Sequence, residues 1–153
     1  MKKLDNTLVI GIGNNTRQDD GLGWVFLDLL EKEGFKTDNL LYKYQLMVED
    51  AELISTFKTV IFIDACKSEI NDGFSFERIY PSEEVSFSTH SVPPNQILNL
   101  CETLYTKKPK AYLMKIEGCN WEIGIGLSKQ AKTNLKNALS YFVENLSEIQ
   151  KFH

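Results

Sequence analysis

Short apolar runs alternate with amphipathic stretches along this chain, which is the pattern of alternating strands and helices. Thr7–Gly13 and Thr59–Ile63 are almost continuously apolar, and this predicts two parallel strands buried on both faces of a sheet. Asn39–Leu46 alternates in part and is predicted as a further strand, as is Ala111–Glu117. Gly73–Tyr80 alternates aromatic and polar residues, which indicates a more exposed strand at an edge of the sheet.

Four helices are predicted between and after these strands. The first starts near Trp24 and ends at Gly34, a residue typical of helix C-termini, and the second covers Glu49–Phe57. The third opens at Pro93-Pro94, because proline suits the first helical turn. Ser128 is predicted to cap the fourth. This order of elements predicts an α/β fold, a three-layer αβα sandwich with a mostly parallel, twisted five-stranded sheet.

Composition excludes several classes of protein. The 153 residues carry a net charge of −4, with 42% hydrophobic and 25% charged residues, and no linker or repeat divides them. We therefore expect residues 1–153 to form a single globular domain. The mild acidity argues against a nucleic-acid partner, and no run reaches the roughly 18–20 apolar residues that a membrane span needs. The helices are amphipathic rather than wholly apolar, which predicts a monomer.

Three widely spaced cysteines indicate a reducing compartment. Cys66, Cys101 and Cys119 are odd in number and form no C-x-x-C pair, so neither a disulfide framework nor a zinc ribbon is indicated. Leu8–Ile12, the apolar run that follows the N-terminal lysines, is too short for a signal peptide. We therefore expect a cytoplasmic protein.

The most informative segment is a glycine-bearing turn that carries two adjacent acids. Leu8–Asn14 runs from a strand into this turn, and Asp19 and Asp20 follow just before a helix. Such turns lie at the carboxyl ends of strands, where open α/β sheets bind their ligands. Two carboxylates in such a place are costly to bury unless a positive charge, such as a bound cation, compensates them.

Two further residues join this turn if the first and third strands are neighbours in the sheet. Asp64 ends the third predicted strand, and His90 lies in a polar loop before Pro93-Pro94. Asp20, Asp64 and His90 would then offer two carboxylate oxygens and one imidazole nitrogen, which suit a borderline divalent ion such as nickel or zinc. Three protein ligands leave coordination positions open, as in metal sites that react rather than stabilise.

Each residue also has a purely structural interpretation. Asp19 and Asp20 can act as turn residues or cap the following helix, where a negative charge is favoured by ~0.3–1 kcal/mol. Asp64 can hydrogen-bond a neighbouring loop, and a single histidine in a loop is more often a surface residue than a ligand. Asn14 can simply tolerate an unusual turn conformation, and Trp121 can serve packing alone.

Other catalytic and cofactor motifs are missing from the sequence. Gly11-x-Gly13-x-x-Thr16 lacks the third glycine of the dinucleotide fingerprint. Neither a phosphate-binding G-x-x-x-x-G-K-[ST] loop nor a G-x-S-x-G nucleophile elbow is present. Cys66 with His90 could form a nucleophile–base pair, but no neighbouring residue indicates an activated thiol.

Taken in order, several segments resemble the hydrogenase maturation protease family. The resemblance extends from about residue 7 to residue 145 and rests on the order and spacing of its parts. One position departs from the family, since Val48 stands where a proline usually precedes the glutamate. The matching parts are Val9-Ile-Gly-Ile-Gly-Asn14 with Asp19-Asp20-Gly21-Leu-Gly23, Tyr44-Gln45-Leu46 with Glu49, Val60-Ile-Phe-Ile-Asp64-Ala65, Ser88-Thr-His90-Ser, Pro94-x-Gln96-x-Leu98, Ile116-Glu-Gly118 and Glu122-x-Gly124-x-Gly126-Leu127-Ser128.

The family consists of nickel-dependent endopeptidases that process the large subunit of nickel–iron hydrogenases. The resemblance implies that Asp20, Asp64 and His90 are both the metal-binding and the catalytic residues, and that the ion is nickel supplied by the substrate. It also implies one partner, the precursor of a [NiFe] hydrogenase large subunit, from which a C-terminal extension is removed.

Two other functions stay open at this point. The same three residues would also serve a non-catalytic, metal-dependent binding module or chaperone that holds a nickel-bearing partner without cutting it. A small-molecule hydrolase or phosphorylase on a similar α/β frame is a third hypothesis, and it predicts turnover without any protein partner. The glycine-bearing turns give this third hypothesis little support, because none is a phosphate-binding loop.

Overall fold

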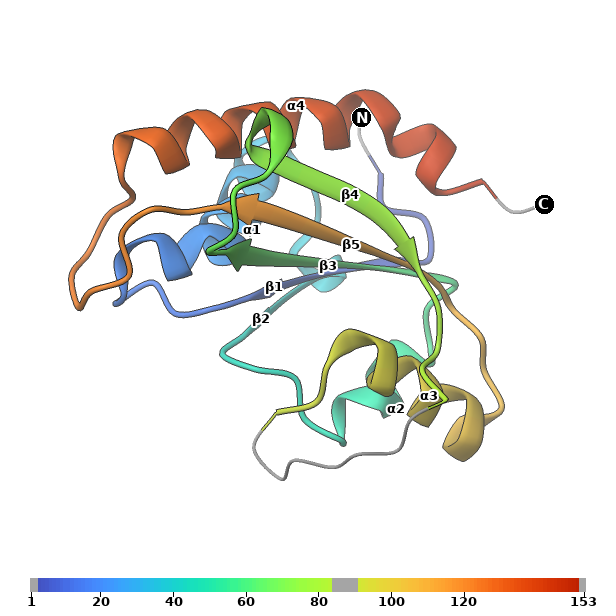
Figure 1. Cartoon of the computed structure of the whole chain (residues 1–153). Helices are drawn as coiled ribbons and strands as arrows, with labels where there is room; N and C mark the ends of the chain where they lie inside the picture. Colours follow the sequence, from blue (N-terminus) through green and yellow to red (C-terminus); the bar gives the residue numbers. More distant parts are fainter. Residues whose placement is uncertain (1–2, 84–90, 152–153) are drawn as a thin grey trace.

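Five strands form a mixed sheet in the computed structural model, which describes residues 3–83 and 91–151. The strand order is β2-β1-β3-β5-β4, and all neighbours are parallel except β4 and β5 (Figure 1). The predicted mostly parallel sheet and the edge position of the fourth strand are confirmed. The strands are β1 (Thr7–Ile12), β2 (Leu40–Lys43), β3 (Thr59–Cys66), β4 (Phe74–Ile79) and β5 (Lys110–Glu117).

Helices cover both faces of this sheet, which confirms the predicted three layers. On one face lie α1 (Leu22–Lys32) and α4 (Lys129–Ile149), and on the other lie α2 (Asp50–Ile54) and α3 (Pro94–Tyr105) (Figure 1). Within the described residues, three short 3₁₀ helices occupy connections between elements: η1 (Gln18–Gly21), η2 (Thr37–Asn39) and η3 (Asn71–Gly73).

Two apolar layers bind the helices to the sheet. Successive side chains of a strand point to opposite faces, so β1 and β3 each contribute to both layers. This explains why both strands are continuously apolar in the sequence, since neither has a face in water. The layer under α1 and α4 receives Val9, Ile61 and Ile63, and the layer under α2 and α3 receives Leu8, Ile10, Val60 and Phe62.

The elements differ from their predicted boundaries at two places that matter for the site. β3 continues to Cys66 instead of ending at Ile63, because β5 pairs with it as far as Glu117. Asp64, which was predicted to end the strand, is therefore followed by two further strand residues. β2 is shorter than predicted and ends at Lys43, and the side chain of Tyr44 is 67% exposed.

Two smaller predictions also have outcomes. Ser128 caps α4 as predicted, since its hydroxyl oxygen accepts a hydrogen bond of 3.2 Å from the backbone N–H of Ala131. Cys66, Cys101 and Cys119 are all unpaired. None of the helices in the described part of the chain combines the length and the apolar character needed to cross a bilayer.

Candidate active site

The carboxyl ends of the parallel strands meet at one edge of the sheet, and a hollow of about 330 Å³ lies there. β1 and β3 are neighbours as the sequence analysis required, and their register places Ile12 beside Asp64. Asp20 from the β1–α1 turn and Asp64 from β3 both line this hollow. The structure thus brings together two of the three predicted site residues.

The β1–α1 turn folds back on itself and so carries Asp20 to the end of β1. Gly13 makes this possible with a φ of 149°, a conformation that side chains disfavour. A Cβ atom at Gly13 would lie 2.0 Å from the carbonyl oxygen of Asp20. That same carbonyl accepts a hydrogen bond of 3.0 Å from the backbone N–H of Asn14, which closes the turn. Any side chain at position 13 would therefore push Asp20 out of place.

The prediction that Asn14 adopts an unusual turn conformation is wrong, because Asn14 has no positive φ; besides Gly13, the residue of this turn that has one is Gln18, at 49°. Asn14 instead acts through its side chain. Its Oδ1 accepts hydrogen bonds from Thr16, 2.9 Å from the backbone N and 2.6 Å from Oγ1. This local bonding is typical of Asn in turns and holds the outer part of the turn rigid.

Asp19 is a fully buried structural residue, and its interpretation as an ordinary turn residue or helix cap is wrong. Its carboxylate accepts hydrogen bonds from the backbone N–H groups of Cys119, Asn120 and Ser128 at 2.7–2.9 Å, and from the Ser128 hydroxyl at 2.6 Å. Burial alone would raise the pKa of Asp19, but these four donors outweigh it and hold the pKa below 3.8. Asp19 therefore ties the β5–α4 loop to the β1–α1 turn.

Asp20 has no such set of donors, although it is the next residue. The cap position of α1 is Gly21, which makes no side-chain capping bond, so the helix does not use Asp20 as its cap. Partial burial raises the pKa of Asp20, while the positive charges of Arg17 and Lys67 and the backbone N–H of Asn14 oppose this shift. Its carboxylate thus faces the hollow and is available to a ligand.

Asp64 is the more strongly perturbed of the two acids. Burial raises its pKa from 3.8 to about 7, and the nearby charge of Asp20 adds to the shift. The backbone N–H of Ala65 and the charge of Lys115 act in the opposite direction. Two carboxylates that repel each other in a poorly solvated hollow have the chemistry of a cation site, because a bound cation stabilises both charged forms.

The third predicted ligand, His90, lies outside the described residues, as does the rest of 84–90. Within 3–83 and 91–151, no group of three or more His, Cys, Asp or Glu side chains gathers in a form that could hold a metal ion. The described donor set of Asp20 and Asp64 fits a divalent cation that receives further ligands from elsewhere. The convergence of His90 on this pair stays a prediction.

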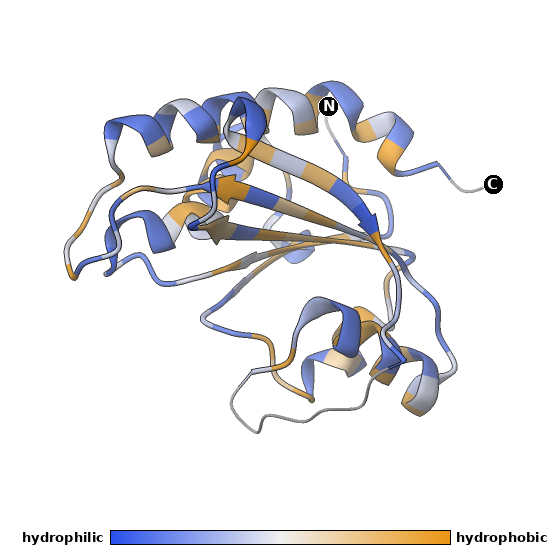
Figure 2. Ribbon diagram, in the orientation of Figure 1, coloured by the Kyte–Doolittle hydropathy of each residue, from blue (hydrophilic) through white to orange (hydrophobic). Residues whose placement is uncertain are grey.

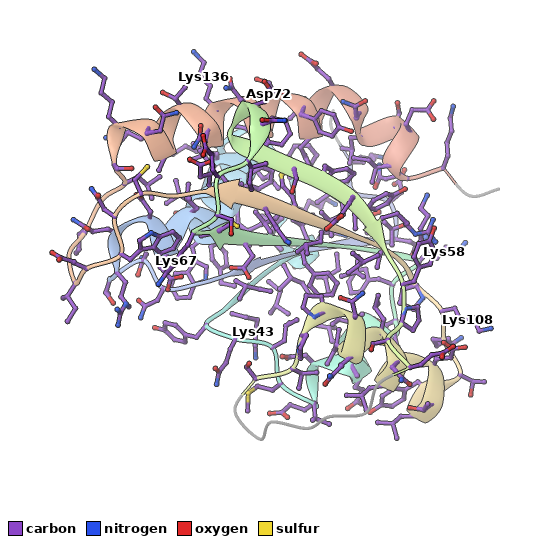
Figure 3. The ribbon with its side chains drawn as sticks, viewed as in Figure 1. Lys43, Lys58, Lys67, Asp72, Lys108 and Lys136 are labelled. Carbon is purple, nitrogen blue, oxygen red and sulfur yellow. The ribbon has the colours of Figure 1, made fainter. Side chains whose placement is uncertain are left out.

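Two cations and an indole complete the hollow, and the sequence analysis did not assign them to the site. Arg17 and Lys67 both line it, as does Trp121. Arg17 Nη2 donates a hydrogen bond of 3.3 Å to the carbonyl oxygen of Trp121, and Lys67 Nζ lies 5.4 Å from the centroid of the Trp121 ring. Lys67 directly follows β3, which places it at this end of the sheet (Figure 3). The position of Lys67 directly after a buried strand is the feature of the sequence from which its place in the site could have been predicted.

The side chain of Trp121 packs tightly against Gly118, as its interpretation as a packing residue predicted. A Cβ atom at Gly118 would lie 3.0 Å from the Trp121 ring and 2.7 Å from the Cβ of Asp19. The indole and the Asp19 side chain therefore both approach Gly118, where only glycine leaves room. Packing and lining the hollow are both observed for this side chain.

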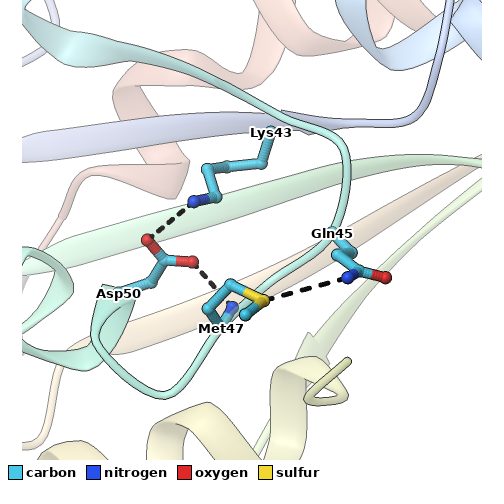
Figure 4. A network of polar contacts seen from close by, with 4 residues as sticks. All are labelled: Lys43, Gln45, Met47 and Asp50. Atoms are coloured by element: carbon cyan, nitrogen blue, oxygen red, sulfur yellow. Dashed lines mark hydrogen bonds and ion pairs between the residues drawn. The ribbon is translucent and has the colours of Figure 1, made fainter. Parts of the chain in front are cut away.

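The β2–α2 loop at the same end of the sheet is fixed by a small polar network (Figure 4). Lys43 Nζ lies 3.1 Å from Asp50 Oδ1, and the backbone N–H of Met47 donates to Asp50 Oδ2 at 2.8 Å. The backbone N–H of Val92 donates to the carbonyl oxygen of Leu46 at 3.0 Å, so this loop also anchors the chain just after residue 90. Val48, the position that departs from the family, is 43% exposed.

Comparison with known proteins depends on the fold, because no family model and no curated protein sequence matches the chain. A hydrogenase maturating endopeptidase, HybD from E. coli, is 20% identical and superimposes with a TM-score of 0.73, covering 94% of this chain and 93% of its own. The [NiFe] hydrogenase maturation protease HycI from Thermococcus kodakarensis is 24% identical over 92% of each chain, with a TM-score of 0.67. This chain has the hydrogenase maturation endopeptidase fold.

A hydrogenase 2 maturation peptidase from a thaumarchaeon shows the same agreement, with a TM-score of 0.65 at 19% identity over 92% of this chain and 97% of its own. The resemblance noted in the sequence is thus confirmed in the fold, along nearly the full length of both molecules. In this maturation endopeptidase fold, the hollow with Asp20 and Asp64 occupies the carboxyl edge of the sheet.

Proposed function

We propose that this chain is a metal-dependent endopeptidase that recognises nickel in the precursor of a [NiFe] hydrogenase large subunit and removes its C-terminal extension. The observation that carries the proposal is the convergence of Asp20 and Asp64 on one hollow, at the end of the sheet where such folds bind ligands. The shared fold with solved maturation endopeptidases supports it.

In this proposal the nickel belongs to the substrate and arrives with it. Asp20, Asp64 and His90 of this chain supply two carboxylate oxygens and an imidazole nitrogen to it, a donor set that suits a borderline divalent ion. A bound divalent ion of this kind polarises a carbonyl or lowers the pKa of a water molecule. Recognition and cleavage then depend on the same three side chains, so that a precursor without nickel is not cut.

The remaining charged residues of the hollow affect the charge state of the two carboxylates. Arg17 and Lys67 balance the two carboxylates before the substrate is present, as their opposing effect on the Asp20 pKa indicates. Before a cation is bound, burial raises the pKa of Asp64 to about 7; a divalent ion at its carboxylate would lower that pKa and favour the charged form.

The test is to incubate the purified chain with nickel-loaded and nickel-free precursor and to measure the mass of the large subunit. Loss of a C-terminal peptide only from the nickel-loaded precursor is the expected result. Asp20→Asn and Asp64→Asn should stop cleavage while preserving the fold, and Asp38→Asn is the matched control because Asp38 is exposed in η2. An unchanged precursor mass in a stable complex would instead identify a non-catalytic binding module.

A further inference from the structure

Two isoleucines of the β5–α4 loop are almost completely exposed to water. Ile123 is 86% exposed and Ile125 is 91% exposed, the highest values among the large apolar side chains of the described residues. Figure 2 shows the apolar colour at the tip of the loop between β5 and α4. Single exposed apolar residues are common, but two neighbouring β-branched side chains with this exposure indicate an interaction site.

The loop that carries them is held in place rather than free to fold the isoleucines inward. Gly124, which separates them, donates its N–H to the carbonyl oxygen of Thr16 and accepts from the N–H of Gln18, both at 2.9 Å. The buried Asp19 carboxylate holds the two ends of the same loop, near Cys119 and Ser128. A pre-ordered loop loses little conformational entropy when a partner covers it.

The isoleucines are continuous with the candidate active site. Gly124 pairs with the backbone on either side of Arg17, and Arg17 lines the hollow beside Asp20 and Asp64. Trp121, two residues before Ile123, lines the same hollow. When a segment of a substrate protein enters the hollow, the part of that protein next to the segment therefore lies beside Ile123 and Ile125.

We propose that Ile123 and Ile125 form a docking point for an apolar surface on the body of the protein that is cut, the large-subunit precursor. This proposal rests on the proposed function, which supplies the identity of the substrate. Neither residue carries charge or a hydrogen-bonding side chain, so the complementary surface is apolar. A stable protein–protein interface buries about 1,200–2,000 Å² of accessible surface, far more than two side chains can bury. This favours a transiently bound substrate over a second copy of this chain.

The experiment compares the wild type with the double variant Ile123→Ser/Ile125→Ser. Cleavage of the nickel-loaded full-length precursor gives kcat and KM, and binding of the same precursor by the chain is measured separately at low temperature. We expect KM and Kd to rise about tenfold to a hundredfold, because water is no longer displaced from two isoleucines. The conservative variant Ile123→Leu/Ile125→Leu should keep most of the affinity.

Leu104→Ser is the control, because Leu104 is 57% exposed on α3, on the other side of the sheet from α4. It should leave both KM and Kd unchanged. Circular dichroism and thermal melting establish that each variant is folded. If the double variant is not folded, Ile123→Ser and Ile125→Ser are measured singly, each with an expected loss of about threefold to tenfold.

The possible outcomes separate this proposal from the proposed function. Cleavage with unchanged KM and Kd in the double variant overturns the docking point and leaves the endopeptidase intact. Binding that depends on the isoleucines but without cleavage by the wild type overturns the endopeptidase and supports the docking point. A wild type that neither binds nor cuts the precursor overturns both. A dimer in sedimentation analysis that becomes a monomer in the double variant also overturns the docking proposal.

Discussion

Replacing Asp64 with asparagine should make the protein more stable at alkaline pH while stopping precursor cleavage. Asparagine has nearly the same shape but carries no charge. In the folded protein the pKa of Asp64 is about 7, against 3.8 for an ordinary aspartate, because its carboxyl is poorly solvated and faces Asp20. The unfolded chain therefore releases the proton more readily, and the free energy of unfolding falls as pH rises from about 4 to about 7.

The magnitude follows from the two pKa values. The whole difference corresponds to about 4 kcal/mol, since each pKa unit is about 1.4 kcal/mol. Water reaches part of this half-buried carboxyl, and part of the change falls below pH 5. Between pH 5 and pH 8.5 we therefore expect the stability of the wild type, relative to Asp64→Asn, to fall by about 2 kcal/mol.

The assay is urea unfolding of both proteins at pH 5, 6, 7 and 8.5, with a chelator present to remove metal ions. The difference between variant and wild type isolates Asp64, since other titrating groups cancel to first order. Asp38→Asn, at an exposed position in η2, should show a difference that does not vary over this range. A difference for Asp64→Asn that is constant with pH, or that shrinks toward pH 8.5, would show that the folded protein does not raise the pKa of Asp64.

Three further predictions address the rest of the site. Asp19→Asn should lower the free energy of unfolding by at least about 3 kcal/mol in urea unfolding, because an amide cannot accept from all four donors. The stability that the Asp19 carboxylate contributes should itself disappear as pH falls through its lowered pKa, below 3.8. Gly13→Ala should cost about 2–4 kcal/mol, from the positive φ and the contact with the Asp20 carbonyl, and should reduce cleavage. Nickel binding to the isolated chain, measured by titration calorimetry, should weaken at least about tenfold from pH 8 to pH 6, because Asp64 and His90 must lose their protons to bind. Asp20→Asn should weaken nickel binding at every pH in this range.

Much of the fold could be predicted because local patterns and packing agree. β1 and β3 are apolar on both faces, so their central position in the sheet follows from burial alone. The convergence of Asp20 and Asp64 followed in turn from one assumption, that these two strands are neighbours. The cap at Ser128 was equally local, since a hydroxyl three residues before a backbone N–H of the first turn is a short-range feature.

The rest of the site depends on partners that are far away in the sequence. The extension of β3 to Cys66 is set by pairing with β5, and this pairing places Asp64 inside the strand, where its pKa rises. The burial of Asp19 depends on donors about 100 residues later, which no local pattern announces. The sequence shows that Ile123 and Ile125 are apolar, but only the loop geometry shows that both face water.

Asp19 and Asp20 are adjacent in the sequence but have opposite environments in the structure. The four donors that surround Asp19 make its charged form the stable one, and its bonds fasten the loop that carries Trp121 and the exposed isoleucines. Asp20 receives no comparable set, and together with Asp64 it leaves negative charge in the hollow, where partial burial raises the pKa of both acids. Arg17 and Lys67 offset this charge only in part, and carboxylates left in this state reduce stability, so two of them side by side are expected where a ligand supplies further positive charge. We therefore expect a cation to bind at Asp20 and Asp64 rather than at Asp19, and we expect the stabilisation by Asp64→Asn and the loss of cleavage to have the same cause.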